Sequence, residues 1–205
     1  MIPYTVKLIP DTLAKTYIWE HHYSHGSHRH PKPCFGLYDS SLIGVLMFAV
    51  PGSERVRASI FGPEYVNHVT ELHRLHILDI TPKNTESWFI SRCLKLLKQE
   101  KPEIWAVMSF SDTTEGHTGI IYQATNAYRI GMSPRATFYR DQNGRLRYPR
   151  QCGINISKSE ALDRGWTIEK RDKKFRYLWL LPDSKAHKTW MIKNCKYDLT
   201  QQSFS

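Results

Sequence analysis

Residues 71–110 read ELHRLHILDITPKNTESWFISRCLKLLKQEKPEIWAVMSF, and this stretch decides the fold class. Its first part, 71–78, alternates polar and apolar side chains, which predicts a strand with one buried face. Residues 87–99 carry apolar side chains at helical spacing, and Pro102 ends that helix. Residues 104–110 are apolar throughout, as is typical of a strand buried on both faces. A strand, a helix and a strand in this order predict a crossover unit of an α/β sheet.

Two hairpins are expected outside this unit. The apolar segments 35–38 and 42–50 are separated by a short polar turn, which predicts the first hairpin. The turn sequence at 141–144, Asp-Gln-Asn-Gly, predicts a second hairpin between 136–140 and 145–148. Shorter elements are expected as a helix over 119–126, a helical turn over 159–164 and a strand over 175–181.

Length and composition favour one globular domain over 1–205, with a tail over 183–205 that we expect to be partly flexible. The chain has 205 residues, of which 40% are hydrophobic. No apolar run approaches the roughly 18 residues that span a bilayer. The four cysteines form no Cys-x-x-Cys pair, so we expect reduced thiols and a cytoplasmic protein without a membrane partner.

The charge predicts a polyanionic partner, for which we expect double-stranded DNA. The formal net charge is +10, and clustered cations gain affinity by releasing counterions from phosphates. Arginines concentrate around the second hairpin, where Asp141 is the acidic residue between the first and last of them. A solvated, charged edge hairpin is the alternative. The arginines are Arg129, Arg135, Arg140, Arg145, Arg147 and Arg150, of which the last five are the predicted DNA contacts.

Two segments carry side chains suited to proton transfer. Five histidines fall within 21–30, and a histidine can act as a base near neutral pH or as a metal ligand. A phosphate-contacting loop and a solvated loop are the alternatives. Asp112 follows a buried strand, where it can act as a base or cap the next turn. His117 and Tyr122 follow in the expected loop and helix, as a candidate proton acceptor and donor, although Tyr122 also suits the core.

These segments resemble the phage Mom DNA-modification proteins. The similarity covers about residues 15–180 and is most specific in Ser109-Phe110-Ser111-Asp112 followed by residues 116–126, GHTGIIYQATN. Residues 20–24, EHHYS, and 72–75, LHRL, add to it.

The resemblance implies a fold of the GNAT acyltransferase type, with a central mixed sheet flanked by helices and an inserted Arg-rich β-hairpin. It implies an enzyme that converts adenine in DNA to N6-carbamoylmethyladenine and so protects phage DNA from restriction. Its functional residues would be His22, Tyr23, Arg74, Asp112 and Tyr122. The family has been linked to iron, for which His22, Tyr23 and Asp112 would be the ligands, and to an acetyl-CoA-like donor.

The loop over 81–87 predicts an anion site at the start of the main helix. Lys83, Asn84 and Ser87 are its candidate substrate-binding residues, together with Arg74 and His117. GNAT acyltransferases hold the coenzyme A pyrophosphate here with a glycine-rich loop, and this sequence lacks those glycines. We therefore expect a donor that is not gripped as coenzyme A is gripped there.

Two other functions are also compatible with the sequence. A small-molecule or protein N-acyltransferase would share the fold without needing the arginine-rich hairpin. A non-catalytic DNA-binding protein would need no proton-transfer groups. The modification hypothesis requires that His22, Tyr23, Asp112 and Tyr122 line one pocket.

Overall fold

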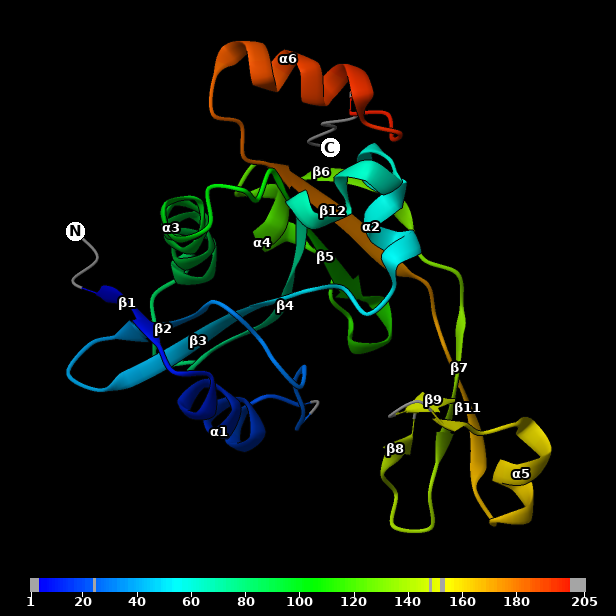
Figure 1. Ribbon diagram of the computed structural model, residues 1–205. Helices are drawn as coiled ribbons and strands as arrows, with labels where there is room; N and C mark the ends of the chain where they lie inside the picture. Colours follow the sequence, from blue (N-terminus) through cyan, green and yellow to red (C-terminus); the bar gives the residue numbers. More distant parts are fainter. Residues whose placement is uncertain (1–3, 24, 148, 152–153, 200–205) are drawn as a thin grey trace. The chain divides into compact units, whose positions relative to one another are not determined.

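The computed structural model describes residues 4–23, 25–147, 149–151 and 154–199 (Figure 1). Internal contacts divide the chain into two compact units, where the sequence had led us to expect one domain. The larger unit comprises residues 1–109, 119–130 and 177–205. The smaller unit comprises residues 110–118 and 131–176, so it contains the predicted arginine-rich hairpin.

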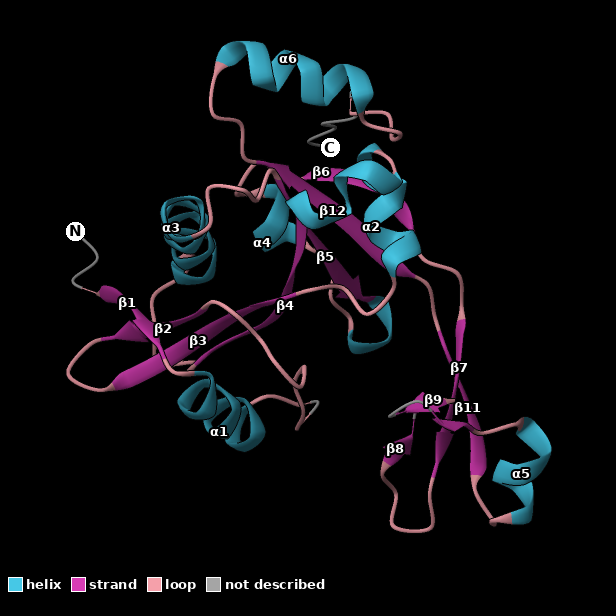
Figure 2. Ribbon diagram, in the orientation of Figure 1, coloured by secondary structure: helices cyan, strands magenta, loops and turns pink. Residues whose placement is uncertain are grey.

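A seven-stranded mixed sheet has the strand order β1-β2-β3-β4-β5-β12-β6 (Figure 2). β1 to β4 pair antiparallel, whereas β4 and β5 pair parallel, as the strand, helix, strand pattern predicted. The first predicted hairpin is confirmed as β2 and β3. The strand bounds are β1 Thr5–Ile9, β2 Cys34–Tyr38, β3 Leu42–Ala49, β4 Val69–Ile77, β5 Ala106–Asp112, β6 Tyr128–Met132 and β12 Lys174–Leu180.

Helices flank this sheet, which agrees with the predicted fold class. α1 contacts β2, β3 and β4, and α3 contacts β1 and α4. The helix predicted over 87–99 is confirmed within α3. No helix in the described ranges is long and apolar enough to cross a membrane. The bounds are α1 Asp11–His21, α2 Glu54–Phe61, the 3-10 turn η1 Pro63–His68, α3 Thr85–Glu100, the 3-10 turn η2 Thr113–Glu115, α4 Ile120–Gln123 and α6 Lys185–Asn194.

The segment over 183–199, which we expected to be partly flexible, contains the packed helix α6. Met191 is fully buried, and the ring of Trp190 lies 5.9 Å from that of Phe61. The Lys196 amide donates to the Ile60 carbonyl at 2.8 Å. These contacts tie α6 and the segment after it to α2, and the partial flexibility of the tail over 183–205 stays a prediction.

α1 is held on the sheet by Ala14, Tyr17 and Ile18, which recur at helical spacing on one face. They pack with Val45 and Met47 of β3 in a buried cluster. The Tyr17 hydroxyl donates to the Ile43 carbonyl at 2.8 Å, so its polar end is also satisfied. Each such apolar side chain contributes about 1.5–3 kcal/mol when buried. The loop that follows α1 therefore leaves from a fixed helix end.

The smaller unit confirms the second predicted hairpin. β7, Ala136–Arg140, pairs antiparallel with β8, Leu146–Arg147, and also with β11, Thr167–Arg171. Asp141 closes the turn by accepting from the amides of Asn143 at 3.0 Å and Arg145 at 2.9 Å. The remaining elements are β9 Arg150–Gln151, β10 Ile154–Asn155 and α5 Lys158–Asp163.

The close packing at the start of α4 predicts how a substitution there changes the stability of the protein. Gly119 precedes α4 with φ +77°, and a Cβ there would collide with the Tyr177 ring. Gly119→Ala should cost about 2–4 kcal/mol of unfolding free energy, because backbone strain and overpacking add. Gly116→Ala is the matched control, since its φ is +73° with open space around a Cβ, and it should cost about 1–2 kcal/mol. Urea unfolding measures both, and equal losses would contradict the packing argument.

Candidate active site

The site begins where β4 and β5 separate. Their pairing runs from Val69 opposite Ala106 to Glu71 opposite Met108, although β4 continues to Ile77. The Ser109 hydroxyl donates to the Leu72 carbonyl at 3.0 Å, so a side chain replaces the next ladder bond. Beyond this point the two strands leave backbone and side-chain groups for other partners.

A β-bulge at His73 changes the direction of β4 within this opening. Met47 of β3 is opposite Arg74, and Phe48 is opposite Leu72, so His73 has no partner residue on β3. A bulge bends the strand and re-aims its side chains. The regular alternation of polar and apolar side chains expected for 71–78 is therefore interrupted at His73.

Glu71 and His73 form a partly buried acid–histidine pair. Their Oε1 and Nδ1 atoms are 3.3 Å apart, and the His73 Nε2 atom is buried without a hydrogen-bond partner among the described residues. Burial lowers the pKa of His73, while the hydrogen bond with Glu71 acts in the opposite direction. His73 is therefore mainly neutral at pH 7. With Nδ1 bonded to Glu71, Nε2 can accept a proton or a hydrogen bond from a substrate.

Arg74 ties the histidine-rich loop to β4. Its Nε donates to the Gly26 carbonyl at 2.9 Å, and one terminal nitrogen donates to the His73 carbonyl at 2.7 Å. In the same loop the His28 ring meets the His73 ring edge-on, with centroids 5.8 Å apart. A guanidinium held in this way suits recognition of a carboxylate or phosphate.

His22 and Tyr23 lie at the end of α1. His22 is buried, and its amide donates to the Ile18 carbonyl at 3.0 Å as the helix ends. The rings of His22 and Tyr23 stack with centroids 4.3 Å apart, while Tyr23 remains about half exposed. Tyr23 therefore presents an aromatic surface to solvent with the buried His22 ring stacked behind it, which suits stacking on a base.

Tyr122 lies among aromatic rings in α4. Its ring packs against those of Tyr177 and Trp179, with centroids 5.2 and 5.3 Å away. Burial raises the pKa of Tyr122, a hydrogen bond with Ser109 lowers it, and the Glu71 charge raises it further, with a net rise. Tyr122 therefore keeps its proton at neutral pH. The electrostatic influence of Glu71 and Arg74 joins it to the residues of β4.

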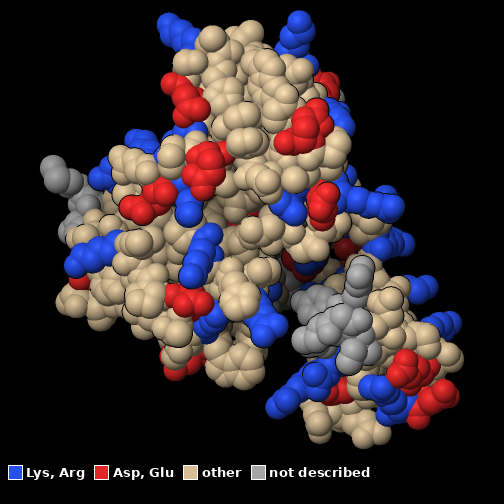
Figure 3. All heavy atoms as spheres, in the orientation of Figure 1, with Lys and Arg blue, Asp and Glu red and all other residues tan. Residues whose placement is uncertain are grey.

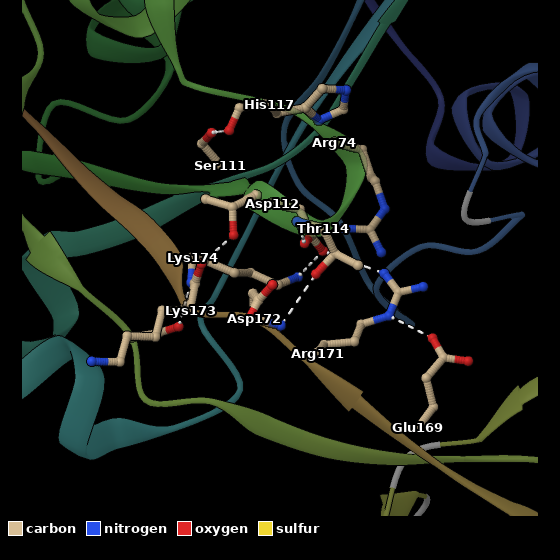
Figure 4. Close-up of polar contacts among 12 residues, drawn as sticks. Arg74, Ser111, Asp112, Thr114, His117, Glu169, Arg171, Asp172, Lys173 and Lys174 are labelled. Atoms are coloured by element: carbon tan, nitrogen blue, oxygen red, sulfur yellow. Dashed lines mark hydrogen bonds and ion pairs between the residues drawn. The ribbon is translucent and has the colours of Figure 1, made fainter.

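Asp112 belongs to the smaller unit and is held by cations (Figure 4). The carboxylate is 4% exposed and lies 2.8 Å from the Lys174 Nζ and 3.5 Å from Arg171. It also accepts from the Thr114 amide at 3.1 Å, which caps η2. Burial raises the pKa of Asp112, but the Lys174 hydrogen bond and charge outweigh it and give a net lowering. An ionised, paired carboxylate is a weak proton acceptor at neutral pH.

His117 is placed by the same loop. Its amide donates to the Asp112 carbonyl at 3.1 Å, and its carbonyl accepts from the Ser111 hydroxyl at 2.5 Å. Its pairing with Tyr122 in one cleft stays a prediction, because the two residues belong to different units. For the same reason the convergence of Asp112 with His22 and Tyr23 stays a prediction.

A metal set is not assembled in the described part of the chain. There, no three His, Cys, Asp or Glu side chains are grouped so that they could hold an ion. The iron ligands implied by the resemblance, His22, Tyr23 and Asp112, belong to two different units, so their convergence on an ion stays a prediction.

The loop before α3 combines a left-handed turn with small hydroxyl side chains. Asn84 has φ +72°, a conformation that asparagine adopts more readily than most residues. The Thr85 and Ser87 hydroxyls donate to the carbonyls of Pro82 at 2.7 Å and Asn84 at 3.0 Å. Lys83 is exposed beside them. The turn forms without glycine, and helix geometry leaves first-turn amides available for an anionic donor.

More of the arginine charge of the hairpin is compensated by carboxylates than the sequence suggested. Arg140 is paired with Glu169, Arg135 lies 3.4 Å from Asp172, and Arg147 lies 2.6 Å from Asp141. Figure 3 shows basic and acidic side chains interleaved over this unit. Arg145 is exposed. The Arg150 side chain lies outside the described structure, so its predicted contact is not assessed.

Sequence reasoning missed Glu71, His73 and Ser109 as site residues. The signal was present in residues 71–76, where charged side chains and two histidines occupy a strand inside the fold. Their significance depends on the bulge and on the parting of β4 from β5, which alternation alone does not reveal.

Comparison with known proteins agrees with this architecture. The Mom protein family matches over residues 3–198. The methylcarbamoylase mom of Escherichia phage Mu is 34% identical over 139 residues, covering 65% of this chain and 56% of the relative. The match thus spans little more than half the length of that relative.

Solved acetyltransferases share the fold. The ribosomal-protein-S5-alanine acetyltransferase of Vibrio fischeri has a TM-score of 0.53 at 10% identity and covers 90% of this chain and 97% of its own. The aminoglycoside acetyltransferase AAC(6')-Ib with coenzyme A has a TM-score of 0.50 at 11% identity, covering 86% and 94%. The fold is of the GNAT type, and such low identity indicates fold alone.

The Asp112 ion pair predicts a pH-dependent stability. Because the folded protein lowers the pKa of Asp112, its carboxylate stabilises the fold above the unfolded value of about 4 and loses this effect as pH falls through the folded value. Asp112→Asn should cost about 1–3 kcal/mol at pH 7 and progressively less below pH ~4. Thermal unfolding across pH measures this, with the exposed Asp163→Asn as control. A cost that does not change with pH would contradict the assignment.

Proposed function

The chain belongs to the Mom protein family, and from this membership we propose that it is a transferase that converts adenine in DNA to N6-carbamoylmethyladenine. The name of the phage Mu relative, a methylcarbamoylase, supports the transfer of a group that contains a carbamoyl unit. In a phage genome such a product would protect the DNA from host restriction, and the reaction would take place in the host cytoplasm. The observation that carries the proposal is the group of Glu71, His73 and Arg74 at the parting of β4 and β5.

The target amine must first be made accessible. The N6 amine of adenine is paired inside duplex DNA, so the enzyme needs an extruded or transiently unpaired base. The exposed Tyr23 ring, which is stacked on His22, offers a surface for such a base. Tyr122 keeps its proton and can donate a hydrogen bond to a base nitrogen or to the donor.

Proton removal falls to His73 in this proposal. As the amine nitrogen forms its new bond to the transferred carbon, the bond from that carbon to the rest of the donor breaks, and the leaving group departs with the electron pair. The amine proton moves to the unpartnered Nε2 of His73, and Glu71 stabilises the resulting imidazolium through Nδ1. Arg74 orients an anionic group of the donor or a DNA phosphate. Asp112 acts by fixing the loop before His117, because its own carboxylate is paired with Lys174.

The donor of the transferred group would meet Lys83, Asn84 and Ser87 at the start of α3. An acetyl-CoA-like donor carries phosphates, and the exposed Lys83 with first-turn amides fits an anion there. The absence of glycines from the loop over 81–87 still favours a mode of donor binding different from that of standard acyltransferases.

A small-molecule or protein N-acyltransferase is the competing function, and the shared fold is compatible with it. Such an enzyme would need no DNA. Salt-sensitive binding to duplex DNA therefore separates the two functions, and nucleoside analysis separates both from a non-catalytic DNA-binding protein.

Nucleoside mass analysis of DNA from cells that express the chain tests the proposal. The wild-type chain should yield carbamoylmethylated adenine. Arg74→Ala and His73→Gln should each lower its amount by about 10²–10⁴-fold, as expected for lost positioning or proton transfer. Lys95→Ala, at an exposed position on α3, should leave it unchanged. Unmodified adenine in the wild-type sample, with the chain folded and expressed, would refute the proposal.

The hairpin predicts a difference between two arginines in DNA binding. Arg145→Ala should reduce the slope of log K against log salt by about one phosphate contact. Arg140→Ala should reduce it less, because Glu169 already compensates that charge. Titration of a DNA duplex at several salt concentrations gives both slopes. A larger effect at Arg140 would show that the ion pair opens on binding and that the compensation argument fails.

A further inference from the structure

An open cavity lies between α1 and the loop that follows it. Its volume is about 480 Å³, within the usual size of small-ligand sites. Figure 1 shows this segment, in dark blue to blue, leading from α1 towards β2. The lining residues are Lys15, Thr16, Trp19, Gly26, Ser27, His28 and Arg29.

Trp19 gives the cavity an exposed aromatic face. The residue is 64% exposed, although burial of a tryptophan in the core is strongly favourable. Its ring meets the His25 ring edge-on at 6.2 Å, and the His25 Nδ1 is 2.8 Å from the Trp19 carbonyl. The loop is thereby held next to an indole that still faces solvent. An indole held in this way is a stacking surface for a planar ring.

The charge around this indole is positive. Lys15 lies one helical turn before Trp19, on the same face of α1, and Arg29 comes from the loop. Asp11 pairs with Lys15 at 2.8 Å but does not line the cavity, and neither does any other described acidic residue. An aromatic face beside Arg29, with Lys15 shared between Asp11 and the cavity, suits a ligand that combines a heterocycle with phosphate, such as a nucleotide.

The cavity shares its loop with the candidate active site. Gly26 lines the cavity with its backbone and accepts from Arg74 through its carbonyl. His28 lines the cavity and meets the His73 ring. A ligand seated there would therefore lie against the loop that Arg74 and His73 hold in place.

From this arrangement we infer that the cavity between α1 and the 26–29 loop binds one nucleotide of the DNA strand, with its base on Trp19 and its phosphates against Arg29 and Lys15. This inference rests on the proposed function, because it takes DNA to be the substrate. The nucleotide part of a coenzyme A donor also combines a heterocycle with phosphate. The experiment below distinguishes binding of such a donor from binding of DNA.

The test measures binding of labelled oligonucleotides to the full chain by fluorescence anisotropy. Trp19→Ala should weaken binding to single-stranded DNA about five-fold or more, and Trp19→Phe should retain most of the affinity. The loss should be smaller for a fully paired duplex of the same length, because paired bases hide their faces. Arg29→Gln should lower the salt slope by about one.

Two controls match these variants. Leu13→Ala removes a 40%-exposed side chain from α1 outside the cavity, and Lys188→Gln removes an exposed cation on α6. Both should bind DNA as the wild type does. Thermal unfolding of every variant confirms that the fold is kept.

Unchanged DNA affinity in folded Trp19→Ala, or an equal loss for paired and single-stranded DNA, would overturn the inference. A loss of acetyl-CoA affinity in Trp19→Ala with DNA affinity intact would assign the cavity to the donor and also overturn it. Failure of the proposed function is read separately, from the absence of modified adenine in the wild-type sample. Trp19-dependent DNA binding would support the nucleotide site even then.

Discussion

The parting of β4 from β5 is the constraint on which the site depends. The strands share three paired positions, after which Ser109 satisfies the Leu72 carbonyl with its side chain. A backbone that leaves its ladder inside a sheet must find other partners for its polar groups. The bulge at His73 falls within this opening, and the charges of Glu71 and Arg74 act there on Tyr122, which is hydrogen-bonded to Ser109.

Burial assigns different protonation states to the polar groups of the two units. In the larger unit it keeps His73 neutral and Tyr122 protonated, which leaves one acceptor and one donor for a substrate. In the smaller unit, Lys174 and Arg171 keep Asp112 ionised despite burial. A carboxylate with two cationic partners stabilises its loop, whereas a histidine with one unsatisfied nitrogen is suited to chemistry.

Turn chemistry predicted the second hairpin, and hydrophobic periodicity was sufficient to predict the crossover unit β4-α3-β5, the first hairpin and the strand β12. It was insufficient for α1 and α6, whose apolar faces are short and whose remaining residues are polar or charged. These helices are stabilised by partners distant in sequence, such as Val45 for α1 and Phe61 for α6. The sequence also overstated the positive charge of the hairpin region. Glu169 of β11 and Asp172, which follows β11, pair with Arg140 and Arg135 and compensate part of that charge.

By itself, the sequence determined the order of the main elements, the turn at 141–144 and the residue types available for function, because these depend on local periodicity and turn chemistry. Arg74 and Tyr122 were also identifiable, through motif similarity. Only the tertiary structure decided that His73 joins Glu71, that Gly26 is bonded to Arg74 and that Asp112 is neutralised by Lys174. These three interactions depend on the register of the strands or on the packing of a loop against a distant strand. The spacing of residues along the chain specifies neither the register nor that packing.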